Sequence, residues 1–470
     1  MKKEFIKYSL LVLVCFSIIA CNDWLSVKPK TEMEAEDLFS TEAGFKDALA
    51  GVYTAMTKSS LYGREMTYGI VDVVAQQWGS IGTNHRYANA LKYEYEATNT
   101  KPIIDTLWSG LYNAIANANS ILAYIDKSSV IFTGDNKQII KGEALALRAF
   151  LHFDLLRMYG TIYEQNPTSK RIAYRTVFNR EPKEMQASNV VVDSIIADLK
   201  QAEILLTDTD PLNFDFPKDE YEEQNMTSDR FLFYRHKRMN LYAVKALLAR
   251  VYLYAGNKIE AANYAKQVID SKQFDFVADV ADLQRSKEIV FSIYVDDFDL
   301  QVKEEFGTNG SYYVSTMNFL YEMFDVTHDG TNDFRIREGV SFDFALNGIT
   351  TRKYRQENMW SSTEGTVVLI RLAEMYYVLA ECAADAQTAA GYLNAVREAR
   401  GVDPTGLTEA TRLNEIEKEY RKEFYGEGQL FFFYKRHGYT TFLHCPVERM
   451  VEKNYMFTWP ENEELFGMTN

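Results

Sequence analysis

Apolar residues recur at helical spacing through most of this 470-residue chain, and this periodicity limits the fold more than any other feature. From residue 103 to 126, for example, Leu107, Leu111 and Ile115 fall on one face of a helix. The same pattern predicts further helices over residues 142–159, 190–206, 240–255, 260–270, 367–384, 386–400 and 409–425. The chain is therefore predicted to be mainly α.

Two of the predicted helical pairs look like copies of one unit. The spacing of Tyr252, Ala261 and Ala265 is repeated at Tyr377, Ala386 and Ala390. Small residues at such points let antiparallel helices approach closely, which is the packing of tetratricopeptide-type hairpins. A long stretch of other sequence separates the two copies, so we predict an array of tetratricopeptide-like helical hairpins that is interrupted.

The segment between the two copies differs in character. Residues 289–295 are β-branched and aromatic and predict a strand, whereas the sequence from there to Gly365 is rich in Gly, Asn, Asp and aromatic residues without helical period. We therefore expect a loop-rich insertion that contains short β-strands. Irregular segments are predicted at 61–100, 165–182 and 271–366, and loops held by a rigid scaffold are where binding surfaces usually lie.

Residues 1–20 have the parts of a secretory signal. A basic start is followed by an uncharged, mostly apolar run that ends at Ala20. This run is too short for a transmembrane helix, which needs about 20 apolar residues. Because Cys21 directly follows a small residue, the arrangement resembles a bacterial lipobox, with an ordinary signal peptide as the alternative. We expect a signal peptide over 1–20, lipidation of Cys21 and one domain over 21–470 that is anchored to a membrane without spanning it.

Composition and cysteine content add limits. The formal net charge is −15, whereas nucleic-acid binding requires clustered Lys and Arg, so no nucleic-acid partner is expected. The chain has 31 Tyr and 29 Phe, and although most must lie in the core, aromatic faces also suit stacking on sugar rings. Cys382 and Cys445 would remain in the mature chain, and the sequence leaves open whether they pair.

Motifs along nearly the whole chain resemble the SusD/RagB family of outer-membrane nutrient-binding lipoproteins. They occur in the family's order, at residues 21–30, 142–160, 246–256, 369–374, 393–397, 421–428 and 460–463. Tyr420 departs from the family pattern because it stands where Glu is usual, and Leu430 and Phe433 stand in the usual Arg and Asp positions. These departures bear on the ligand class, whereas the remaining motifs imply the SusD-like fold.

The resemblance implies a surface-exposed, lipid-anchored protein of the outer membrane. Such a protein would capture oligosaccharide for import by a SusC-like TonB-dependent outer-membrane transporter as its partner. A peptide ligand is the alternative of the same kind, and a surface glycan-degrading enzyme is the alternative from another class. The charged motif residues lie among apolar residues on predicted helices, so we expect buried ion pairs from Arg371, Glu374, Arg397, Glu423 and Glu427.

The sequence lacks the common catalytic motifs and has one incomplete metal-binding pattern. The sequence has no phosphate-binding glycine loop, no H-E-x-x-H and no C-x-x-C pair, so neither an enzyme nor a cofactor is predicted. Residues 325–333 place several oxygen ligands around Gly330, as calcium loops do. Because Thr327 and Ile336 occupy ligand positions, we expect a solvated turn and predict no metal site, although calcium is left open.

The candidate ligand-binding residues come from the irregular segments. A glycan site needs flat aromatic faces and polar groups that reach hydroxyls. The loop at residues 78–87 and the insertion supply both kinds, in Trp78, Asn84, His85, Arg86, Tyr87, Tyr312, Tyr313 and Trp360. We expect the loop and the insertion to form one face that grips the ligand.

Overall fold

The structure, a computed structural model, describes residues 35–79, 81–179, 181–213, 230–306, 316–345, 348–354 and 365–466. The predicted signal peptide and Cys21 therefore lie outside the described residues. None of the helices within these ranges combines the length and apolar character that a membrane span requires.

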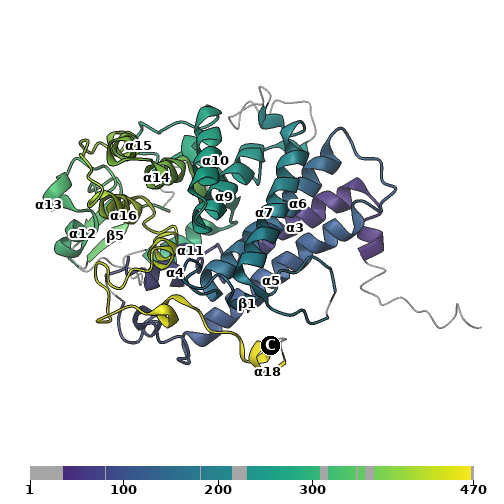
Figure 1. The fold of residues 1–470 in the computed structure, drawn as a ribbon, viewed down its shortest axis with the longest axis horizontal. Coiled ribbons are helices and arrows are strands. Elements are labelled where there is room, and N and C mark those ends of the chain that lie inside the picture. The colour runs from purple at the N-terminus through teal and green to yellow at the C-terminus, as the bar shows by residue number, and fades with distance from the viewer. Residues whose placement is uncertain are drawn as a thin grey trace, which may run out of the picture.

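Long helices pack side by side through the N-terminal half of the chain (Figure 1). They are α3 (Glu42–Met56), α5 (Lys101–Tyr124), α6 (Asn136–Tyr159) and α7 (Ser188–Thr207). Every residue of α6 from Gly142 to Tyr159 is buried, so this helix lies at the centre of the group. Gly142 lies against α7, where a Cβ would come within 2.9 Å of the Leu206 side chain, so the close approach of these helices needs glycine.

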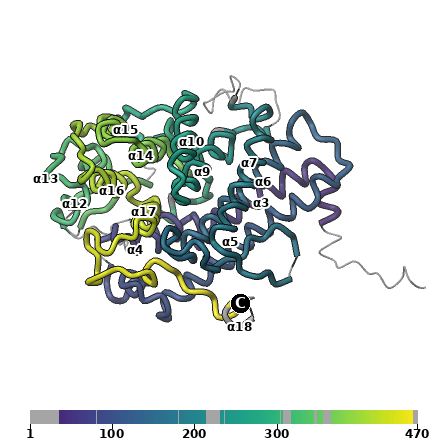
Figure 2. The backbone as a smooth tube through the Cα atoms, viewed as in Figure 1, coloured from purple at the N-terminus to yellow at the C-terminus, as the bar shows by residue number. Residues whose placement is uncertain are grey.

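Two helical hairpins continue this group. They are α9 (Leu241–Tyr254) with α10 (Lys258–Asp270), and α14 (Leu372–Cys382) with α15 (Ala386–Ala399). Helix α10 packs against α14, so the two hairpins are neighbours in space although they are distant in sequence (Figure 2). Ala261 and Ala265 are fully buried, as close packing of the hairpin requires. The predicted tetratricopeptide-like hairpins are confirmed, and α16 (Arg412–Glu423) extends the array.

One predicted helix boundary is wrong. The segment 367–384 was expected to be a single helix, but its first part belongs to strand β6 (Thr366–Arg371), and α14 begins only after it. Strand β6 pairs antiparallel with β3 (Ile289–Tyr294), which is the predicted strand. The β-branched residues of β6 favour an extended chain, and its hydrogen-bonding partner comes from a segment that local periodicity cannot reveal.

Short elements make up the chain between β3 and β6. The helices are α11 (Phe298–Phe306), α12 (Met317–Met323) and α13 (Val326–Asp329), and the strands β4 (Phe342–Ala345) and β5 (Gly348–Thr351) pair as a hairpin. This confirms a loop-rich insertion with short strands. The remaining elements with a role below are the short helix α4 (Ile70–Val74) and α17 (Leu430–Arg436).

Candidate functional site

The loop at residues 78–87 lies against the first helix of the insertion. The Arg86 guanidinium forms an ion pair with Glu305 of α11, and Arg64 reaches the same carboxylate at 3.4 Å. The Trp78 ring packs on Phe306, with ring centroids 5.5 Å apart. The two irregular segments that were expected to share a face are therefore in contact, whereas their contact with a ligand stays a prediction.

Two of the predicted stacking residues are buried. The Trp78 side chain is 3% exposed and its indole N–H donates to the Tyr68 carbonyl oxygen at 3.0 Å. Tyr87 is 0% exposed and its hydroxyl donates to Glu65 at 2.7 Å. Neither ring can offer a face to a sugar in this conformation, which corrects their assignment as platforms. Local sequence could not separate them from exposed aromatics because their burial depends on the surrounding tertiary packing.

The polar members of the loop are more accessible. Asn84 is exposed, and His85 and Arg86 are half-buried. The backbone N–H of Tyr87 donates to His85 Nδ1 at 3.2 Å, which places the proton of a neutral ring on Nε2. Burial and the neighbouring Arg86 charge lower the pKa of His85, so the imidazole is neutral at physiological pH. These side chains offer both donors and acceptors of the kind that bind sugar hydroxyls.

The other three predicted aromatics, Tyr312, Tyr313 and Trp360, lie outside the described residues. The described rings nearest to them in sequence, Phe306 and Tyr354, both pack on Tyr68 at centroid distances of 5.2 and 5.6 Å. These rings belong to one group, here called the aromatic cluster, which consists of Tyr68, Trp78, Phe298, Phe306, Tyr354 and Tyr425. The cluster joins the loop to the insertion through apolar contact.

An open cavity of about 870 Å³, which the sequence did not indicate, lies beside the start of α11, where Asp296 lines it. Its wall combines α3 with residues 231–238 and the end of β3. Tyr294 and Tyr234 line it and are 64% and 36% exposed. Residues Ile289 to Ile293 of β3 are all buried and only Tyr294 at its end is exposed, so no alternation in the sequence could have indicated this position. Helix α11 has nine residues, so it is about 13 Å long.

A second group of side chains joins the insertion to α16 by charge. This group, here called the ionic core, consists of Arg335, Lys353, Arg371, Arg397, Arg400 and Lys422 with Glu288, Asp329, Asp333, Glu419, Glu423 and Glu427. Glu423 is its centre and accepts from Arg371 at 2.5 Å, Arg400 at 2.7 Å and Arg335 at 3.0 Å. Burial alone would raise the pKa of Glu423, but these guanidinium groups hold it well below the usual range.

The pairing expected for the motif charges is confirmed. Besides the ionic core, Arg250 forms an ion pair with Glu374 at 2.6 Å between α9 and α14. The departure at Tyr420 also has a physical explanation, because its ring packs on Phe433 with centroids 4.6 Å apart. Aromatic contact therefore occupies this position of the late helices, where the family pattern has charged residues.

The acidic residues 325–333 are engaged with cations. Asp325, His328 and Asp329 place ligand atoms within 4.8 Å of one another. However, Asp329 accepts from Arg397 at 2.8 Å and also pairs with Lys422. Burial alone would raise the pKa of Asp329, but the interactions with Arg397 and Lys422 outweigh burial and lower the pKa below its ordinary value. The carboxylate is therefore a charged partner for the basic residues. This geometry favours salt bridges over a calcium site.

Cys382 and Cys445, whose pairing the sequence left open, are free thiols in the structure.

The structure defines a class of mainly α proteins in which a loop-rich insertion interrupts an array of tetratricopeptide-like hairpins. Comparison with known families identifies the family within this class. A family model described as "Starch-binding associating with outer membrane" matches residues 23–216, and that of the "SusD family" matches residues 286–462. The chain belongs to the SusD/RagB family.

Curated relatives agree with this membership, and solved structures share the fold. SusD-like proteins P2 and P38 of Formosa agariphila are 27% and 28% identical over 44% and 57% of this chain. These alignments span 39% and 46% of the two relatives' own length. A SusD superfamily protein of Bacteroides vulgatus aligns with a TM-score of 0.70 at 22% identity, over 91% of this chain and 97% of that one. A laminarin binding SusD-like protein aligns with a TM-score of 0.62 at 19% identity, over 85% and 92% of the two chains.

Proposed function

We propose that this protein is a surface-exposed, lipid-anchored nutrient-binding protein that captures oligosaccharide for import by a partner TonB-dependent outer-membrane transporter. The observation that carries the proposal is that, in a chain of the SusD/RagB family, the loop 78–87 and the insertion meet at one aromatic cluster. The family description, which names starch binding and the outer membrane, supports the ligand class and the location.

The ligand surface in this proposal runs from the loop toward the open cavity. Asn84, His85 and Arg86 supply hydrogen bonds at one end, and Tyr294 and Tyr234 supply aromatic surface at the other. The roughly 13 Å length of α11 between them suits an extended oligosaccharide better than a monosaccharide. We also propose Tyr312, Tyr313 and Trp360 as stacking residues.

Binding measurements with purified protein test the proposal. Isothermal titration against soluble starch, laminarin and other glycans, and against mixed peptides, should show binding to a glycan that is recovered uncut. A hydrogen bond to a neutral group is worth about 0.5–1.5 kcal/mol, so Asn84→Ala and Arg86→Ala should each weaken binding about two- to tenfold. Lys266→Ala, on the exposed face of α10, is the matched control. Binding to peptides alone would favour the alternative ligand, and shortened glycan products would indicate an enzyme.

Anchoring is tested separately. We propose that residues 1–20 are removed and that residues 21–470 are held to the outer membrane by lipid on Cys21. Cys21→Ala should therefore move the protein from the membrane fraction to the soluble fraction, and Cys382→Ala should not. A Cys21→Ala variant that stays with the outer membrane at high salt would contradict the lipid anchor.

A further inference from the structure

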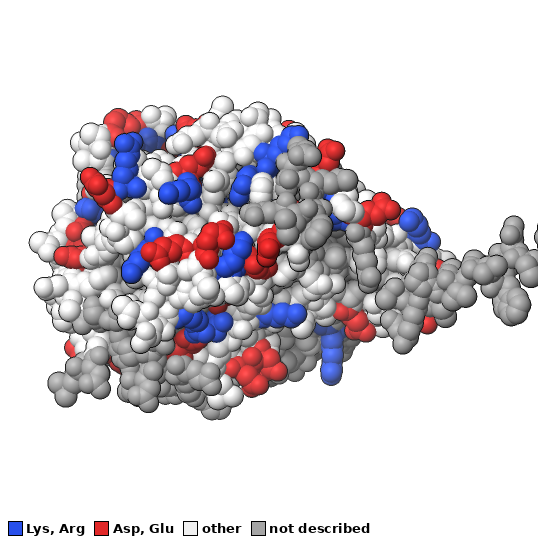
Figure 3. Space-filling model, turned by 90° about the horizontal axis from the view of Figure 1, so that it is seen from below, with Lys and Arg blue, Asp and Glu red and all other residues white. Residues whose placement is uncertain are grey.

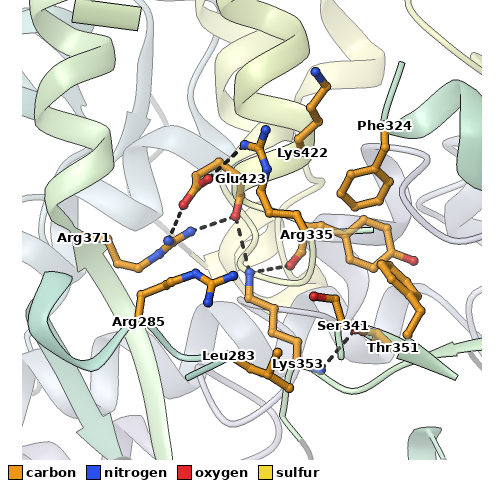
Figure 4. Close-up of a pocket in the computed structure, with 12 residues that line it drawn as sticks. Leu283, Arg285, Phe324, Arg335, Ser341, Thr351, Lys353, Arg371, Lys422 and Glu423 are labelled. Carbon is orange, nitrogen blue, oxygen red and sulfur yellow. Dashed lines mark hydrogen bonds and ion pairs between the residues drawn. The ribbon is translucent and has the colours of Figure 1, made fainter. Parts of the chain in front are cut away.

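A small cavity of about 40 Å³ lies between the insertion and α16 (Figure 4). Its wall holds the cations Arg285, Arg335, Lys353, Arg371 and Lys422, and Glu423 is the acidic side chain among its described lining residues. Four of these cations belong to the ionic core and have carboxylate partners there. Arg285 is not part of that core.

The Arg285 side chain is buried without a carboxylate. It is 5% exposed, and within the described ranges no Asp or Glu oxygen lies at ion-pair distance from its guanidinium. Its Nη1 donates to the Asp282 carbonyl oxygen at 2.6 Å, and the group lies 4.5 Å from the centroid of the Phe334 ring. In the view of Figure 4 the guanidinium extends between Arg371 and Lys353 without a bond to either.

The charges around the cavity do not balance. The ionic core has as many carboxylates as cations, so Arg285 adds one positive charge beside a set of charges that is balanced in itself. Burial and the charges of Arg400 lower the pKa of Arg285 to about 10, and the guanidinium is still protonated at neutral pH. A buried charge of this kind requires a counter-charge.

The backbone also holds Arg285 in an unfavourable conformation. Its φ is +56°, in the left-handed region that residues with a side chain seldom adopt. Such a conformation costs free energy and persists where the surrounding fold imposes it. Arg285 lines the cavity from this backbone position.

We propose that this cavity is a binding site for a small monovalent anion, for which chloride is the fitting ligand. One negative charge balances Arg285, whereas a divalent anion would leave an excess of negative charge. The lining residues are largely buried, so the site cannot admit a glycan chain, and Leu283 and Phe324 give it apolar walls that suit a weakly hydrated ion. The site is separate from the proposed glycan surface and does not depend on it.

Crystals of the wild-type protein soaked in sodium bromide provide the direct test. An anomalous bromide peak in contact with the Arg285 guanidinium is the expected result. Bromide peaks on the outer surface without one at Arg285 would overturn the proposal.

Thermal unfolding gives a second test. At constant ionic strength, replacing sodium gluconate by sodium chloride should raise the melting temperature of the wild type and leave that of Arg285→Gln unchanged. Because the variant loses an uncompensated buried charge, it should melt at or above the wild-type temperature in gluconate. Arg175→Gln, at a half-buried arginine outside the cavity wall, should keep the chloride response. An equal chloride response in wild type and Arg285→Gln would overturn the proposal, and the bromide test decides the matter if the variant does not fold.

Discussion

The ionic core and the aromatic cluster both attach the insertion to the helical array, but they do so by opposite chemistry. In the ionic core each cation is matched by a carboxylate, and Glu423 alone serves three guanidinium groups. In the aromatic cluster, ring centroids lie 4.8–6.3 Å apart. The stabilisation comes mainly from the removal of apolar ring surface from water. Loss of one ring removes only its own contacts, whereas loss of one charge leaves its partners buried without compensation.

The two groups also differ in what they position. The aromatic cluster includes Trp78 and Phe306, so it supports the loop and the helix that carry the proposed ligand surface. The ionic core holds α16 against the β4–β5 side of the insertion and leaves the exposed polar loop untouched. Rigid support of a binding surface can therefore come from rings, while charge pairing fixes the scaffold behind it.

Removal of the central carboxylate should have the largest effect. Glu423→Ala leaves Arg335, Arg371 and Arg400 short of a partner, and breaking a buried pair in this way costs about 3–5 kcal/mol. Urea unfolding monitored by circular dichroism should show this loss. A decrease of less than about 1 kcal/mol in the free energy of unfolding would mean that the ionic core does not stabilise the fold through paired charges.

Removal of one ring should have a somewhat smaller effect on stability. Trp78→Ala is expected to cost about 3 kcal/mol, at the lower end of the range for a buried Trp, because the remaining rings can partly close the space. Trp78→Phe keeps most of the contact area and should cost less. If Trp78→Ala instead melted normally and lost glycan affinity, the ring would be a ligand platform after all.

Acid should weaken the ionic core and leave the aromatic cluster unchanged. Burial alone would raise the pKa of Glu419, but the charges of Arg335, Lys422 and Arg397 outweigh burial. The pKa is lowered to about 2 from an ordinary value of 4.5. Since the folded pKa lies below the unfolded one, this stabilisation is complete above pH 4.5 and is lost as the pH falls toward 2. Glu419→Gln should therefore flatten the pH dependence of the unfolding free energy in that window. If Glu419→Gln and the wild type showed the same pH dependence of the unfolding free energy between pH 2 and 4.5, the lowered pKa of Glu419 would be contradicted.

The smallest effect is expected for charges on the surface. On the face drawn in Figure 3, basic and acidic side chains are interspersed, and water screens them. Lys266 pairs with Asp270 at 2.9 Å on exposed α10, and Lys266→Ala should leave the melting temperature within experimental error of the wild type. A marked drop would mean that burial is not what separates the ionic core from other ion pairs.

Periodicity in the sequence was enough to predict most of the helical array. The pattern over residues 142–159 lies within α6, and the alanine spacing at Ala261 and Ala265 indicated the hairpin packing that the structure shows. The strand at β6 was missed because its neighbour β3 lies far away in sequence, and pairing across such a distance leaves no local period. Arg371 and Glu423 could be predicted to be paired, since buried charges require partners, but not which partners.

The sequence by itself determined the helical scaffold and the need for buried ion pairs, because these follow from local periodicity and from the cost of burying charge. The order of its motifs indicated the family by resemblance. Only the tertiary structure decided which aromatics are covered. Trp78 and Tyr87 lie in a polar loop and look exposed, yet both are buried, with Trp78 packed against α11. Tyr294, at the end of a buried strand, is exposed at an open cavity. Exposure depends on which distant segment packs over a residue, and long-range packing has no signature in the neighbouring sequence.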